Sequence, residues 1–120
     1  MSQETSPGNS QYIDAVQFER LNGTFEIFPA VARIFSDLLP SWLEDVQRCR
    51  DTQDLEDLAD KLHKMKGCCG MMGAYVLSKE IAVLEKHILQ SGLQENMSEL
   101  SDILRKIKEM NTEVCRLAKG

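Results

Sequence analysis

The sequence lacks any long hydrophobic run. Nowhere in its 120 residues do about eighteen apolar residues follow one another, which is the length that a membrane-spanning helix needs. The first residues also lack the apolar core of a secretory signal peptide. We therefore expect a soluble, cytoplasmic protein that makes no contact with a membrane.

Clusters of basic residues are missing too. The chain has 14 Lys and Arg against 19 Asp and Glu, a net charge of −5, and the two signs are mixed along it. Nucleic-acid-binding surfaces gather Lys and Arg on one face, so nucleic acid is not an expected partner. The sequence also has no glycine-rich nucleotide loop and no evident acidic metal cluster. We expect no kinase activity, no enzyme machinery for nucleotides and no cofactor bound by this chain.

Cysteine is present, but not in a pattern typical of disulfides or metal sites. Cys49, Cys68, Cys69 and Cys115 occupy apolar or nearly apolar helical positions, and no Cys-x-x-Cys or His-x-x-x-His spacing accompanies them. Neighbouring side chains on a helix point about 100° apart, so Cys68 and Cys69 do not pair easily. We expect reduced core cysteines and no metal. A metal or redox site built on Cys68 and Cys69 is a minor alternative.

Strand patterns are absent, because no segment alternates apolar and polar residues over a useful length. Helical periodicity recurs instead. The sequence predicts an all-α fold, an antiparallel four-helix bundle with a short additional N-terminal helix. A length of 120 residues with 42% hydrophobic residues fits one domain, expected over residues 11–120. Residues 1–10 are polar and predict a disordered tail or a linker remnant.

The chain gives start and stop signals for five helices. The short one is expected from Asp14, its capping residue, to about Asn22, covering one end of the bundle. The long ones are expected at about 28–50, 53–72, 74–90 and 96–118, the last with a capping box between Asn96 and Glu99. Pro40 interrupts the second helix, but the apolar period continues in phase, so we expect a kink and not a break.

Each of the four long helices has an apolar stripe that predicts its buried side. In the second helix the stripe is Val31, Ile34, Phe35, Leu38, Trp42, Val46 and Cys49. In the third it is Leu55, Leu58, Leu62, Met65, Cys69 and Met72, at spacings of three and four. In the fourth helix the stripe is Leu77, Ile81, Leu84 and Ile88, and in the fifth it is Leu100, Ile103, Leu104, Ile107, Met110, Val114 and Leu117. His63 lies off the apolar stripe of the third helix, on the side that a packed bundle leaves to solvent.

The surroundings of His63 on the helix are unusually open. Ala59 stands one turn before it, Gly67 one turn after and Gly70 two turns after, so we predict that these three small residues clear a docking site around the imidazole. Glycine in a helix interior costs roughly 1 kcal/mol relative to alanine, which indicates a gain other than helix stability. Lys66, one turn on, is predicted to stabilise a bound phosphate.

Other charged or apolar residues nearby have weaker predictions. Lys64 and Met71 are possible parts of a docking surface. Asp60 and Glu56 are read as solvated carboxylates that either orient the imidazole or pair with the lysines. His87 has no comparable set of small residues and lysine around it, and it is predicted to lie at the boundary between core and solvent.

The segment around His63 resembles the signature of histidine-containing phosphotransfer (HPt) domains. It reads His63-Lys64-Met65-Lys66-Gly67, followed by the small pair Cys68-Cys69 and by Met72-Gly73-Ala74; Leu77 and Leu84-Glu85 also stand where the family usually has them. The resemblance extends from about Ile13 to Leu117. Met65 replaces the usual leucine, and the two cysteines replace serine or alanine, so only the local packing departs from the family pattern.

The resemblance implies a phosphocarrier of a two-component phosphorelay. His63 would accept a phosphoryl group, through Nε2, from a receiver-domain aspartate and pass it to another receiver. The implied partners are the receiver domains of a hybrid sensor histidine kinase and of a response regulator, with Mg²⁺ in the receiver and this chain a monomer. The alternative is a helical interaction module that docks without phosphoryl transfer. The direction of phosphate flow, and whether the chain is free-standing or part of a larger kinase, stay open.

Overall fold

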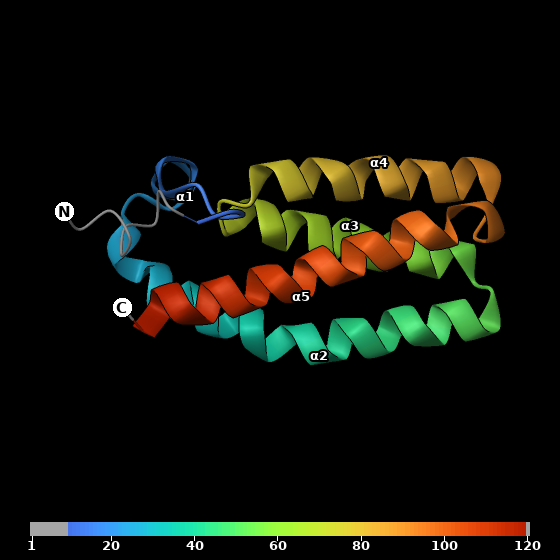
Figure 1. The fold of residues 1–120 in the computed structure, drawn as a ribbon, viewed down its shortest axis with the longest axis horizontal. Coiled ribbons are helices and arrows are strands. Elements are labelled where there is room, and N and C mark those ends of the chain that lie inside the picture. The colour runs from blue at the N-terminus through green and yellow to red at the C-terminus, as the bar shows by residue number, and fades with distance from the viewer. Residues whose placement is uncertain (1–9, 120) are drawn as a thin grey trace.

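The structure is a computed structural model that describes residues 10–119. The described residues form five α-helices, two short 3-10 helices and no strand (Figure 1), so the prediction of an all-α bundle is confirmed. The elements are α1 (Ala15–Asn22), η3 (Phe25–Ile27), α2 (Phe28–Thr52), α3 (Leu55–Met71), α4 (Tyr75–Ser91), η4 (Gln94–Asn96) and α5 (Met97–Lys119). The predicted tail falls, apart from Ser10, outside the described residues.

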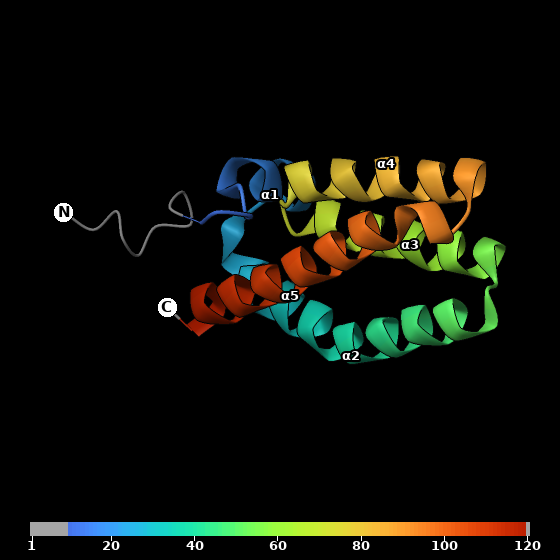
Figure 2. The ribbon, with the colours of Figure 1, turned by 45° about the vertical axis from the view of Figure 1, so that its right-hand side comes forward.

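The four long helices lie along the long axis of a molecule of 48 × 23 × 22 Å (Figure 1). Short connections join α2 to α3 and α3 to α4, so consecutive helices run antiparallel. The small helix α1 lies at one end of the bundle in both views (Figure 2). No helix among the described residues is long and apolar enough to cross a membrane.

Helix α1 closes that end of the bundle, as the sequence predicts. Its cap forms as expected, because Asp14 Oδ1 accepts hydrogen bonds from the backbone N–H groups of Val16 at 2.9 Å and Gln17 at 3.3 Å. Phe18 is fully buried and packs edge-on against Phe28, with ring centroids 5.1 Å apart.

The turn between α3 and α4 fits against the start of α1 only because residue 73 is glycine. The Asp14 N–H donates to the Gly73 carbonyl at 2.9 Å. Gly73 has a φ of +86°, and a Cβ there would lie 2.7 Å from the Asp14 carbonyl oxygen. Any side chain would therefore clash with backbone in an already unfavourable conformation.

Helix α2 is continuous through Pro40, which confirms that the proline does not split it, and Figure 2 shows it curved. Its predicted buried stripe is partly wrong. Ile34 is 60% exposed and Leu38 41% exposed, and Val31 is only half-buried. The buried row is Phe28, Ala32, Phe35, Leu39, Trp42, Val46 and Cys49.

The error in α2 has a simple geometric cause. Leu38 and Leu39 are neighbours, so they point about 100° apart, yet both continue an apolar series with helical spacing. When apolar residues fill two adjacent rows of one helix, periodicity alone does not tell which row faces the core. The outer row, including Ile34 and Leu38, becomes an exposed apolar surface.

The other core predictions hold. In α3, Leu58, Leu62, Met65 and Cys69 are buried, and so is Met72 just beyond the helix, while Leu55 is half-buried. In α4 the buried row is Leu77, Ile81, Leu84 and Ile88. In α5 it is Leu100, Ile103, Ile107, Met110 and Val114, with Leu104 and Leu117 half-buried.

The capping box predicted at the start of α5 does not form. The Asn96 side-chain amide donates to the carbonyl oxygens of Gly92 at 2.6 Å and His87 at 3.1 Å. The Glu99 carboxylate lies 3.0 Å from His87 Nδ1. Both side chains are thus engaged with the end of α4, and the 3-10 turn η4 leads into α5 instead.

Candidate functional site

His63 projects from α3 on the side opposite the core. Its side chain is 62% exposed, whereas those of Leu62 and Met65 on the same helix are fully buried. This confirms the predicted solvent-facing position of the imidazole. The ring is held from one side by a residue of the neighbouring helix α4.

That residue is Glu85. Its Oε1 atom lies 3.5 Å from His63 Nδ1 and 3.8 Å from Lys66 Nζ, so one carboxylate oxygen stands between the imidazole and the ammonium group. The side chains of Glu85 and Lys66 are only 21% and 28% exposed, which favours their mutual attraction. With Nδ1 beside Glu85, Nε2 is the ring nitrogen that has no partner among the described residues.

The sequence did not identify Glu85 as the partner of His63. Asp60 and Glu56 are predicted either to orient the imidazole or to pair with the lysines. Asp60 Oδ2 lies 3.5 Å from Lys64 Nζ, which confirms the pairing for Asp60, whereas Glu56 makes no side-chain contact with the imidazole in the described part of the chain. The signal for Glu85 was its place in the family pattern, directly after the buried Leu84. Which α4 residue meets α3 depends on how the two helices are rotated, and periodicity within one helix does not fix that.

Only one of the three predicted clearing residues opens the surface around His63. A Cβ on Gly67 would meet nothing within 4 Å. Ala59 is buried, with 5% exposure, so it belongs to the packed interior. A Cβ on Gly70 would lie 3.5 Å from Ser78 Oγ, so Gly70 faces α4. The predictions for Ala59 and Gly70 as docking clearance are therefore wrong.

The helical wheel explains this division. At about 100° per residue, Ala59, Lys66 and Gly70 fall roughly 20–60° to one side of His63, which is the side that α4 covers. Gly67 and Met71 fall roughly 40–80° to the other side, toward α2. His63 therefore has a polar flank formed with α4 and an open flank that continues toward α2.

The open flank leads into an apolar groove of about 190 Å³, which we call the α2–α3 groove. Its lining residues are Val31, Ile34, Phe35 and Leu38 of α2 with Gly67, Cys68, Met71 and Met72 from α3 and its C-terminal end. Met71 is 46% exposed, as predicted for a docking residue. Lys64 is 60% exposed and pairs with Asp60. The α2 residues that sequence reasoning placed in the core thus form one wall of an exposed groove next to the candidate site.

The four cysteines are free thiols, and Cys68 and Cys69 are poorly suited to metal or redox chemistry. Burial raises the pKa of Cys69 to about 12 and also raises the pKa of Cys68. The thiolate is the form that binds metals and attacks disulfides, so both shifts oppose such a role. The part of the chain that the structure describes holds no group of three or more His, Cys, Asp and Glu side chains arranged for a metal ion.

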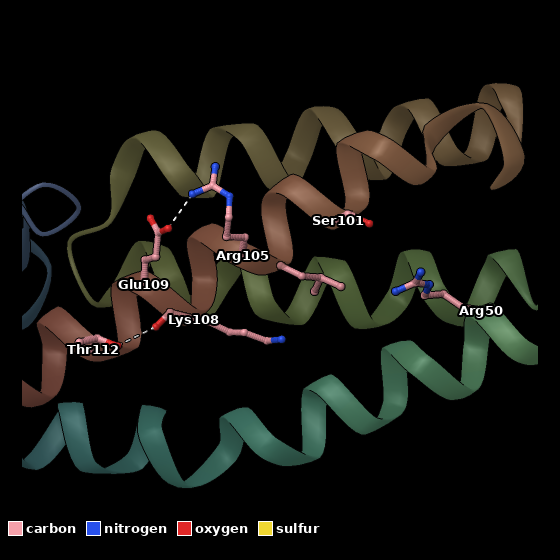
Figure 3. Close-up of a pocket in the computed structure, with 7 residues that line it drawn as sticks. Arg50, Ser101, Arg105, Lys108, Glu109 and Thr112 are labelled. Atoms are coloured by element: carbon pink, nitrogen blue, oxygen red, sulfur yellow. Dashed lines mark hydrogen bonds and ion pairs between the residues drawn. The ribbon is translucent and has the colours of Figure 1, made fainter.

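A second groove, between α2 and α5, is lined by charged side chains (Figure 3). Arg105 in it is already paired along its own helix, with Glu109 at 2.6 Å and Asp102 at 2.7 Å. Arg50 and Lys108 come from different helices and are separate in the view (Figure 3). The groove contains no histidine and no convergent set of reactive groups, so the surroundings of His63 are the better candidate.

Comparison with protein families supports the same region. A family model described as Hpt domain matches residues 30–117. The match includes nearly all of α2 to α5, and therefore His63, Lys66, Gly67 and Glu85, whereas α1 lies outside it. Neither a curated protein nor a solved structure gives a significant match.

Proposed function

Since this chain belongs to the Hpt domain family, we propose that it carries a phosphoryl group on His63 within a two-component phosphorelay. The group arrives from the aspartyl phosphate of one receiver domain and leaves to the aspartate of another. The observation that supports this most directly is the exposed imidazole whose Nδ1 faces Glu85, with Lys66 contacting the same carboxylate oxygen.

The carboxylate of Glu85 prepares the imidazole for attack. It favours the tautomer with the proton on Nδ1, which leaves the Nε2 lone pair free to act as nucleophile. As the bond from Nε2 to phosphorus forms, the bond from phosphorus to the receiver aspartate breaks and the carboxylate departs. The imidazole gains positive charge, and Glu85 stabilises that charge at Nδ1. In the return step the same electron movements run in reverse.

Lys66 supplies a mobile positive charge for the phosphoryl oxygens. Its ammonium group is one turn from His63 and can move from Glu85 toward a phosphate, because its contact with Glu85 is long, at 3.8 Å, and partly exposed. Phosphoryl transfer depends mainly on in-line placement and charge neutralisation. We infer that Mg²⁺ and the other catalytic groups belong to the receiver, and that this chain acts as a cytoplasmic monomer.

The receiver docks, in this proposal, over the α2–α3 groove. Gly67 belongs to that groove and follows His63 by one turn, so a partner seated there would reach the imidazole from its open flank. The other flank is occupied by Glu85 and Lys66. Ile34 and Leu38 provide exposed apolar area that stabilises a complex when it is removed from water.

Phosphate labelling tests the carrier function. The chain is mixed with a receiver domain that carries labelled aspartyl phosphate and, separately, with phosphoramidate as a donor that needs no docking. We expect label from both donors, acid-labile and alkali-stable, located at His63. Binding of the receiver without any label would instead support the interaction-module alternative.

A charge placed in the groove tests the docking surface. Ile34→Glu should lose at least about tenfold in receiver-dependent labelling, since a buried unpaired carboxylate disfavours the complex, yet keep labelling by phosphoramidate. Val83→Glu is the matched control, because Val83 lies on α4 and is 47% exposed; this variant should keep labelling by the receiver and by phosphoramidate. Equal receiver-dependent rates for these two variants would contradict docking over the groove.

A further inference from the structure

Lys66 is held by α4 at two points. The Ser78 hydroxyl donates a hydrogen bond to the Lys66 backbone carbonyl at 3.0 Å, and Glu85 Oε1 lies 3.8 Å from Lys66 Nζ. Ser78 and Glu85 are seven residues apart, so they lie two turns apart on one face of α4. We call this pair the α4 clamp.

The clamp acts where α3 is intrinsically weakest. Gly67 follows Lys66 directly, and Gly70 lies one turn after Lys66, in the last turns of the helix. Glycine has the largest backbone freedom of any residue and, after proline, the lowest helix propensity. A helix end with two glycines would therefore open more readily than the rest of α3, unless another element restrains it.

Gly70 lies on the side of α3 that faces Ser78. A Cβ at that position would lie 3.5 Å from Ser78 Oγ, an ordinary van der Waals distance, so position 70 faces the serine side chain. The Lys66 carbonyl is the helical acceptor for the Gly70 N–H, and its second lone pair is available for the Ser78 hydroxyl. The hydrogen bond from α4 thus reinforces the same carbonyl that closes the glycine-containing turn.

From this geometry we propose that Ser78 is a positioning residue, which holds the glycine-containing turn of α3 so that Lys66 stays beside His63 and Glu85. The effect of Ser78 on phosphoryl transfer rests on the proposed function. Ser78 acts through Lys66 and needs no contact with phosphate. Because transfer depends on positioning, loosening this turn should slow the reaction even when the bundle stays folded.

A double-mutant cycle in receiver-dependent transfer tests the role of Ser78. Ser78→Ala should slow transfer by about twofold to fivefold, the effect of one lost hydrogen bond and no more than the loss expected for Lys66→Ala. In a Lys66→Ala background the same change should have no further effect, because the residue that it positions is gone. Ser101→Ala, at an exposed serine of α5, is the control and should match the parent. A parental rate in Ser78→Ala, or an equal loss in both backgrounds, would overturn the positioning role.

Hydrogen exchange of the unphosphorylated protein tests the clamp without assuming any phosphate transfer. In Ser78→Ala the Gly70 amide should exchange roughly tenfold faster than in the parent, while amides in the centre of α5 stay unchanged. If the parent protein accepts no phosphate, the proposed function fails, and hydrogen exchange alone then tests whether the α4 clamp restrains this turn of α3. Unchanged exchange at Gly70 would overturn it.

Discussion

The two histidines of this chain have more in common than their sequence contexts indicate. Both are exposed, with 62% of the His63 side chain and 46% of the His87 side chain open to solvent. Both present Nδ1 to a glutamate of a neighbouring helix, at 3.5 Å from Glu85 and 3.0 Å from Glu99. A carboxylate partner therefore does not distinguish a phosphate acceptor from an ordinary surface histidine.

The difference lies in what surrounds each pair. One turn after His63 stands Gly67, which opens onto the α2–α3 groove, whereas one turn after His87 stands Ser91. Glu85 also contacts Lys66, but Glu99 contacts no lysine in the described part of the chain. Access for a partner and a cation for the phosphate are thus the features that set His63 apart.

Replacing His63, the proposed phosphate acceptor, should have the largest effect on labelling. His63→Gln should fold normally and accept no phosphate from either donor, because glutamine has no nucleophilic ring nitrogen. His87→Gln should be labelled like the parent. The measurement is label per protein after incubation with phosphoramidate and with a phosphorylated receiver. Label that persists in His63→Gln would assign the acceptor elsewhere.

Filling the open side of His63 should have the next largest effect. Gly67→Gln places a side chain between the imidazole and the groove, and a displacement of about 1 Å can cost on the order of a hundredfold in rate. Ser91→Gln, the same distance from His87, should leave transfer unchanged. Receiver-dependent rates and thermal unfolding are measured on both variants. A Gly67→Gln protein that transfers at the parental rate, or that unfolds early, would contradict a docking role for this glycine.

The sequence predicts α3 better than α2 for a physical reason. In α3 the apolar residues form a single row with charged residues around it, so the buried side and the exposed His63 follow from periodicity. In α2 two adjacent rows are apolar, and the outer one, with Ile34 and Leu38, becomes the groove wall. Its role becomes visible only when the helices are packed.

Contacts between helices were the other part that the sequence could not supply. The pairing of His63 with Glu85, and the capture of Asn96 and Glu99 by the end of α4, depend on the rotation of one helix against another. The local sequence predicts a capping box at Asn96, but the side chains of Asn96 and Glu99 interact with the end of α4 instead. The family resemblance placed Glu85 in the pattern without saying what it touches.

Removing the cation should have a smaller effect than blocking the docking side. Lys66→Ala should slow transfer by about fivefold, which corresponds to the roughly 1 kcal/mol of one partly exposed charge contact. The effect should shrink as salt is raised, because screening already weakens the contact in the parent. Lys86→Ala, at an exposed lysine beside His87, is the control. Equal rates for both variants at low and moderate salt would assign Lys66 to solubility alone.

The smallest effect is expected on stability, and it concerns why residue 67 is glycine. Gly67 lies within α3, has no positive φ, and a Cβ there would meet nothing within 4 Å. Gly67→Ala should therefore raise the free energy of unfolding by up to about 1 kcal/mol through helix propensity. Gly73→Ala is the opposite case, because its Cβ would lie 2.7 Å from the Asp14 carbonyl oxygen at a φ of +86°, and it should destabilise by roughly 1–3 kcal/mol.

Chemical denaturation of the two alanine variants separates a glycine that the fold requires from one that it does not. If Gly67→Ala is more stable than the parent while Gly67→Gln transfers slowly, the glycine beside His63 is retained at a cost in stability, as expected for a surface that a partner must approach. If Gly67→Ala is instead less stable, the helix itself needs this glycine. The contrast between His63 and His87 would then rest on Lys66 and the α2–α3 groove alone.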